Sequence, residues 1–183
     1  MTTMTPGAID LCELIDDAPP ITLTSRTDEG DPPAETGGEP ADEAWTVSDE
    51  CAWGFIGEDS REWEMEFSYQ AIIDADDRDR RFQMAGDAFD ERSAAAEEGF
   101  AEVEFDQSDT TEDGRRRELF GSLGSGAQGY VLVREVKSSV YVIRIREQGQ
   151  GAEDATYQVH QFGAHASAVA ALVDNPLRDV VPD

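Results

Sequence analysis

The sequence predicts an α+β domain: a mostly antiparallel sheet of about five strands, with two long helices packed on one face and a short N-terminal helix. Two observations support this fold class. Several segments alternate apolar and acidic residues, as strands with one buried and one solvated face do. Two longer segments carry apolar residues at helical spacing. The chain of 183 residues suffices for one domain with its own core, which we expect over residues 8–176.

The ends of the chain and one internal segment are expected to lie outside the packed core. We expect residues 1–7 and 177–183 to be tails. Residues 25–43 are expected to form a mobile acidic loop, because the segment SRTDEGDPPAETGGEPADE contains no apolar residue larger than Ala. Before that loop, AIDLCELI predicts a short helix over residues 8–15, which DDAPP ends.

The next part of the chain predicts two strands and a helix. CAWGF places Cys51, Trp53 and Phe55 on one face of a strand. EWEMEFSYQA alternates between a mainly aromatic face and a mainly acidic face, which is typical of a half-buried antiparallel strand, and GEDS is expected to form the turn between the two. Residues 76–96 then predict a helix with acids in its first turn and Gly99 at its end.

The C-terminal part predicts three more strands and a closing helix. FAEVEFD alternates apolar residues and acids, so we expect a strand with Ala101, Val103 and Phe105 pointing inward. DQSDTTEDGRRRE is expected to be a loop. GYVLVREVKSSVYVIRIRE holds two β-branched runs joined at KSS, which predicts a hairpin. Residues 155–173 carry an unbroken apolar stripe, so we expect a helix there that ends at Asn175 and Pro176.

The net charge is −27, from 41 acidic and 14 basic residues. We favour adaptation to high salt, because molar salt shortens the Debye length to about 3 Å and screens the repulsion between carboxylates. The alternative is a polyanion mimic that occupies a nucleic-acid-binding protein. Under both interpretations, direct binding to nucleic acid is disfavoured, because the phosphate backbone repels such a surface.

The chain contains two cysteines, Cys12 and Cys51. Cys51 shares the apolar face of its strand with Trp53, and Cys12 lies on a helix whose apolar face needs a surface to cover. A disulfide would pin this helix over the sheet and close a loop of about 40 residues, which stabilises by on the order of 4 kcal/mol. Two buried, unreactive thiols are the alternative.

No motif predicts catalysis, a metal site or a cofactor. His160 and His165 are the only histidines, and their spacing on a helix keeps them from binding one metal ion together. Both fall off the apolar stripe of that helix, so we expect both on the solvated surface. DADDRD lacks the glycine of a calcium loop, and GSLGSGAQG lacks the Gly-Lys-Ser/Thr end of a phosphate loop. We therefore expect no catalytic residues. An enzyme whose site is assembled from dispersed residues is an alternative.

Two groups of arginines are candidate partner-binding residues. Arg115, Arg116 and Arg117 form a run in an acidic segment, where pairing with neighbouring acids is the alternative. Arg144 and Arg146 are expected on the solvated face of the sheet, where a guanidinium could bind an anionic group and cross-strand ion pairing is the alternative. The acids expected on that same face are Glu62, Glu64, Glu66, Glu102, Glu104 and Asp106.

Three features of the chain resemble a known family. They are a cysteine in the N-terminal helix (IDLCELI), a Cys-x-Trp strand (CAW) and a glycine-rich lead into a late hairpin (LGSGAQGYVLVREVKSSVYVIRIRE) before a closing helix. Together they resemble a family of secreted actinobacterial lipoproteins of unknown function. The resemblance implies a PsbP/Mog1-like fold and a bond between Cys12 and Cys51. It also implies an extracytoplasmic domain whose lipid anchor lies upstream of this chain.

These observations predict an extracytoplasmic, non-catalytic binding or accessory domain from a lipid-anchored or secreted protein, adapted to high salt. Its partner is expected to be a protein or a component of the cell envelope. We expect contact with a membrane only through an anchor absent from this chain, since no apolar run approaches about 18 residues. No signal-peptide pattern begins the chain. A cytoplasmic acidic decoy is therefore the alternative.

Overall fold

The computed structural model describes most of the chain, namely residues 9–37, 45–57, 60–73, 77–112, 114–148 and 159–181. Within these residues it contains three helices and eight strands. The helices are α1 (Leu11–Asp17), α2 (Arg78–Glu98) and α3 (Val159–Val180). The strands are β1 (Leu23–Arg26), β2 (Ala34–Thr36), β3 (Thr46–Ile56), β4 (Glu62–Ile72), β5 (Phe100–Thr111), β6 (Gly114–Leu123), β7 (Gln128–Val136) and β8 (Ser139–Glu147).

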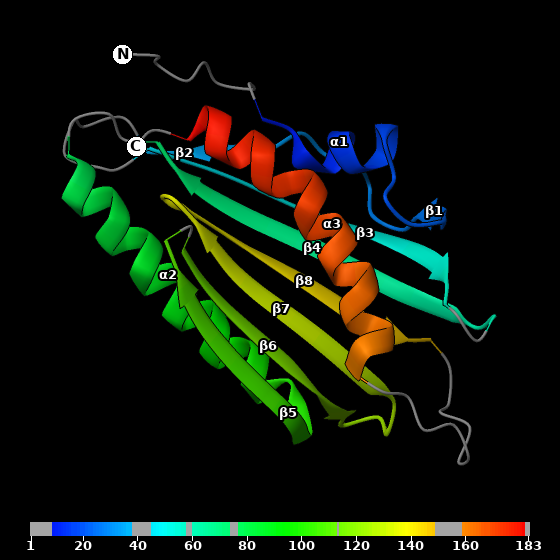
Figure 1. The fold of residues 1–183 in the computed structure, drawn as a ribbon. Coiled ribbons are helices and arrows are strands. Elements are labelled where there is room, and N and C mark those ends of the chain that lie inside the picture. Colours follow the sequence, from blue (N-terminus) through cyan, green and yellow to red (C-terminus); the bar gives the residue numbers. More distant parts are fainter. Residues whose placement is uncertain are drawn as a thin grey trace.

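The described strands form one antiparallel sheet in the order β1-β3-β4-β8-β7-β6-β5, and β2 pairs with β3. Helices α1 and α3 pack on one face of this sheet, and α2 packs on the other (Figure 1). The protein therefore has three layers. The prediction of about five strands with both long helices on one face is wrong in the number of strands and in the number of layers.

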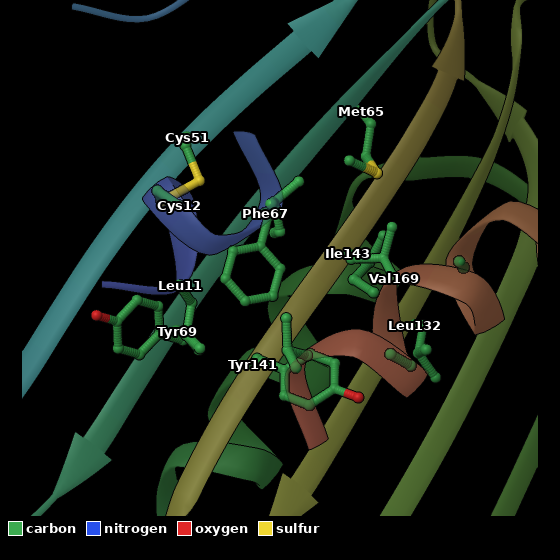
Figure 2. Packing of buried hydrophobic residues seen from close by; sticks show 14 of the residues in the cluster. Leu11, Cys12, Cys51, Met65, Phe67, Tyr69, Leu132, Tyr141, Ile143 and Val169 are labelled. Atoms are coloured by element: carbon green, nitrogen blue, oxygen red, sulfur yellow. A yellow bond between two sulfur atoms is a disulfide. The ribbon is translucent and has the colours of Figure 1, made fainter. Parts of the chain in front are cut away.

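The larger core lies between the sheet and the helices α1 and α3. On β3 and β4 the predicted alternation is confirmed, and the apolar side chains of both strands are buried on this face. Figure 2 shows Leu11 of α1 beside Phe67 and Tyr69, and Val169 of α3 beside Ile143. Because α1 and α3 cover different strands of this face, together they bury its apolar side chains.

A second, smaller core explains why α2 packs on the opposite face. Val131 and Val133 of β7 and Val142 of β8 point away from α3 and pack with Ala85 and Phe89 of α2. Strands that are buried on both faces read as continuous apolar runs without alternation. The runs YVLV and SVYVI have this pattern, and it indicates a covering layer on each side of the sheet.

The segment expected to be a loop between the third strand and the late hairpin is instead the hairpin of β5 and β6. Arg115 to Arg117 pair with Ser108 to Thr110 in the antiparallel register. Two irregularities in the register of β5 change which side chains pack, so that Phe100 and Phe105 contact the cores while Ala101 and Val103 are exposed. The prediction that Ala101 and Val103 point inward is therefore wrong.

Helix α3 continues past the position where we expected it to end. Pro176 lies inside the helix, and Leu177 and Val181 beyond it are buried in the larger core. The ammonium group of Lys137 donates to the carbonyl oxygens of Arg178 at 2.6 Å and Val181 at 3.3 Å. Burial of apolar side chains and these bonds at the helix C-terminus offset the cost of the proline. The predicted start of this helix, residues 155–158, lies outside the described residues.

The acidic segment 25–43 includes structure that its composition does not predict. Strand β2 and the end of β1 fall within it, and both pair with β3. Residues 38–44 lie outside the described residues, as do residues 58 and 59 of the predicted GEDS turn and the tail residues 1–7.

Candidate functional site

The disulfide between Cys12 of α1 and Cys51 of β3 is present, with Cα atoms 6.0 Å apart, which confirms the predicted pairing. Both residues are buried, and the bond joins α1 to the sheet on the α3 face (Figure 2). Trp53, two residues further along β3, donates its indole N–H to the carboxylate of Asp16 in α1. The short helix is therefore attached to β3 by a covalent bond and a charge-assisted hydrogen bond.

Two carboxylates lie close together beside this disulfide. Oxygen atoms of Asp10 and Asp49 and the sulfur of Cys12 lie within 4.8 Å of one another. Because the sulfur is bonded to Cys51, it is not a thiolate that could bind a metal. Burial raises the pKa of Asp49, and the charge of Asp10 raises it further. Ionisation of Asp49 in this arrangement therefore costs stability.

A cluster of hydrogen bonds fixes the turn after β1 against β3. Arg26 donates to Asp28 and to Asp16, each at 2.8 Å. Asp28 also accepts from the backbone N–H of Ala52 at 3.1 Å and of Gly30 at 3.0 Å. Burial by itself would raise the pKa of Asp28, but the bonds from Arg26 and from the two backbone groups outweigh it and hold the pKa at about 2. Asp28 is therefore a fixed anion at the wall of the groove described next.

A groove runs over the face of the sheet that carries α2. It consists of three depressions with volumes of about 640, 670 and 310 Å³. The smallest lies between the other two, because it shares Asp28, Glu50 and Ser68 with one of them and Glu66 and Arg144 with the other. The three depressions therefore form one continuous surface across β3, β4 and β8.

The candidate residue Arg146 lies in this groove, where it is neutralised. Its guanidinium pairs with the carboxylate of Glu64 and, at 3.3 Å, with that of Glu66. These are the cross-strand ion pairs that the sequence offered as the alternative to partner binding. Glu102 and Glu104, which we expected near these residues, lie on the edge strand β5, and two strands separate β5 from β8.

Arg144 is in a different situation, although it lies on the same strand and the same face. It stands directly opposite Glu66 in the register of β4 and β8, but it makes no ion pair with any residue that the structure describes. Its neighbour is Arg92 of α2, which donates to the hydroxyl of Ser68 at 3.2 Å. Ser68 follows Glu66 by two residues and shares its face of β4. The guanidinium of Arg92 therefore lies diagonally across from Arg144.

The two arginines influence one another. Burial lowers the pKa of Arg92, and the positive charge of Arg144 lowers it further. Both side chains are half-buried. Among the described residues, neither guanidinium has a carboxylate bonded to it. The groove therefore holds two adjacent arginines, one in its central depression and one in the depression beside it, in a protein with 41 acidic residues.

The run Arg115, Arg116 and Arg117 does not form one basic surface. Because the run lies on strand β6, its side chains alternate between the two faces of the sheet. Arg115 donates to the carbonyl oxygen of Gly86 in α2 at 2.8 Å, and Arg117 to that of Ser93 at 3.3 Å. The carboxylate partners are Asp90 and Glu135 for Arg115, Glu118 for Arg116, and Glu97 and Asp106 for Arg117. Partner binding by this run stays a prediction, and these bonds make it a weaker one.

Neither histidine is among the residues that line the groove in the part of the chain that the structure describes. His160 is exposed, as expected. The prediction that His165 is also a solvated surface residue is wrong, because its ring packs against Phe55 at 5.1 Å and against Trp63 at 5.6 Å between ring centroids. This contact places His165 at the α3 face of the sheet.

Sequence reasoning missed Arg92 and Ser68 as candidate site residues. One signal in the sequence could have found Arg92, which follows the buried Phe89 by three residues and therefore lies beside the apolar face of α2. A cation at such a position must reach a polar group at the border of the core.

No protein-family model, curated protein or solved structure matches this chain. Among the helices that the structure describes, none has the length and apolar character needed to cross a membrane. The resemblance to secreted lipoproteins therefore stays an expectation, and the function has to be argued from the geometry of the groove.

Proposed function

We propose that this chain is a non-catalytic binding or accessory domain that works outside the cytoplasm, as part of a secreted or lipid-anchored protein. The groove beside α2 is its binding surface. The observation that carries the proposal is the pair Arg92 and Arg144, of which Arg144 lines the central depression of this groove and Arg92 lines the depression beside it. Two half-buried cations with no bonded carboxylate among the described residues favour an anionic group from a partner.

The disulfide supports the proposed compartment. Disulfides persist in oxidising environments and are rare in the cytosol of most organisms, where thiols are kept reduced. Here the bond attaches α1 to the sheet and is buried with it, so it serves the structure of the fold.

The chemistry of the groove supports binding over catalysis. Its described lining offers carboxylates, arginines and serines, whereas His165 packs at the other face of the sheet and His160 is exposed on α3. Cys51, which is among the lining residues of the central depression, is oxidised. A serine or cysteine nucleophile is most often activated by an adjacent histidine, and neither histidine is among the described residues that line the groove.

The two adjacent arginines of the groove also favour this proposal over an acidic decoy. A mimic of nucleic acid would present anions to the basic surface of its partner. Two adjacent arginines would repel such a surface. The excess of 41 acidic over 14 basic residues is better explained by adaptation to high salt.

The experiment places a photo-crosslinking amino acid at Glu50, which is exposed on the wall of the groove. The matched control carries the same amino acid at Ser167, which is exposed on α3 at the opposite face. Each variant is irradiated with cell-envelope and cytoplasmic fractions of the source cells. We expect a discrete adduct from position 50 with the envelope fraction only. An adduct with the cytoplasmic fraction alone, or none from position 50, would contradict the proposal.

A further inference from the structure

We propose that Arg92, Arg144 and Ser68 form a subsite for one carboxylate group, supplied by an acidic side chain of a partner segment that also carries basic residues. The inference rests on the proposed binding role of the groove and specifies the chemistry of the partner.

The geometry brings three donors to one place. Ser68 and Arg144 are diagonal neighbours on the same face of β4 and β8. In the register of these strands, Arg144 lies opposite Glu66, and Ser68 lies opposite Val142. Arg92 reaches the same place from α2, where it donates to Ser68 at 3.2 Å. Each guanidinium offers a planar fork that matches the two oxygens of a carboxylate.

Arg144 forms no ion pair with the described residues, although carboxylates lie near it on β4, as a comparison with Arg146 shows. Glu66 stands opposite Arg144, but its carboxylate pairs with Arg146 at 3.3 Å. Arg146 also pairs with Glu64. One arginine of the strand therefore has two carboxylates, while its neighbour two residues away has a second arginine beside it. A bound carboxylate would neutralise this second pair.

The surroundings determine which anion fits. Asp28, Glu50 and Glu66 line the central depression of about 310 Å³ together with Arg144. Asp28 pairs with Arg26 and Glu66 with Arg146, so Glu50 supplies the uncompensated negative charge among these three acids. This charge repels a phosphate dianion more strongly than a carboxylate with its single charge. It also attracts a positive group beside the bound carboxylate. The partner segment is therefore expected to place its acidic residue beside a basic one.

The test uses the tripeptide Lys-Glu-Lys with blocked ends, so that its only carboxylate is the glutamate side chain. The matched ligand is Lys-Gln-Lys, and inorganic phosphate is the third probe. Affinities are measured by calorimetry and by the Nε–Hε resonances of the arginines at constant KCl concentration. We expect Lys-Glu-Lys to bind at least about ten-fold more tightly than Lys-Gln-Lys, and to shift the resonances of Arg92 and Arg144. Equal binding of the two tripeptides, or tighter binding of phosphate, would overturn the subsite.

The variants are Arg144→Gln and Arg92→Gln, with Arg78→Gln as the control that removes the same charge from an exposed position at the start of α2, outside the lining of the groove. We expect the first two to weaken Lys-Glu-Lys by about ten-fold or more, and Arg78→Gln to change its affinity less than about two-fold. Thermal unfolding verifies that each variant is folded. An equal loss in all three variants would show general electrostatics and overturn the subsite.

The crosslink at position 50 separates this inference from the proposed function. If the double variant Arg92→Gln with Arg144→Gln keeps the envelope adduct, the subsite is wrong and the binding role stands. If the crosslinking protein with Arg92 and Arg144 intact gives no adduct, but this protein still distinguishes Lys-Glu-Lys from Lys-Gln-Lys, the subsite stands and the proposed function is wrong.

Discussion

Glu66 and Arg144 stand directly opposite one another on β4 and β8, yet the carboxylate of Glu66 pairs with Arg146. Arg146 therefore receives carboxylates from two positions on β4, and Arg144 is left beside Arg92. This choice of partners leaves two adjacent arginines without a bonded carboxylate, among the described residues, in a groove whose other charged side chains are mostly acidic. The predictions below test the elements that hold this surface in place.

Loss of the disulfide should reduce stability strongly. The double variant Cys12→Ser with Cys51→Ser removes the bond without leaving a lone thiol. We expect the free energy of unfolding to fall by about 4 kcal/mol, because the unfolded chain regains the entropy of a loop of about 40 residues. Urea titration measures this, and wild-type protein in reductant is the control. A loss of less than about 1 kcal/mol in both would show that α1 needs no covalent attachment.

Asp28→Asn should destabilise the protein at neutral pH by about 1 to 2 kcal/mol. The folded-state pKa of about 2 lies below the usual value of 3.8. The stabilisation is therefore fully present above about pH 4 and is lost as the pH falls through 2. We expect the difference between wild type and variant, measured by urea titration, to shrink over this interval. Asp31→Asn, which removes an exposed charge nearby, is the control. A difference that is constant with pH would argue against a bonded, ionised Asp28.

Asp49→Asn should have the opposite effect and stabilise the folded protein at neutral pH. Burial and the neighbouring Asp10 raise the pKa of Asp49, so its ionised form costs stability above that pKa and the cost disappears as the pH falls through it. We expect the unfolding midpoint at pH 7 to rise by about 2 to 4 °C relative to wild type, and by more than in Asp31→Asn. The gain should be smaller at pH 3. Thermal unfolding followed by circular dichroism measures the effect, and a lower midpoint at pH 7 would contradict it.

Salt should stabilise the folded protein. With 41 acidic and 14 basic residues, repulsion opposes the compact state at low ionic strength. We expect the thermal midpoint to rise between dilute buffer and molar KCl. Sulfate is not a suitable test, because it strengthens burial in all proteins. If the midpoint does not rise in KCl, adaptation to high salt is the wrong explanation of the charge.

Local patterns in the sequence determined which side chains share a face of β3 and β4, and where the two cysteines could meet. The alternation of period two is a property of the strand itself, so Cys51, Trp53 and Phe55 could be placed together before the fold was known. The apolar stripe of α3 was readable for the same reason, since helical spacing is also local.

Only the tertiary structure decided which helix covers which face, and which charges become neighbours. The fold class failed because the packing of α2 depends on the second apolar face of β7 and β8, far along the chain from α2. The meeting of Arg92 and Arg144 likewise needs α2 to cross the sheet at Ser68. Ion pairs depend on distances of a few ångströms between segments remote in sequence. A chain with 41 acids offers many partners for each arginine, and only the packed sheet selects among them.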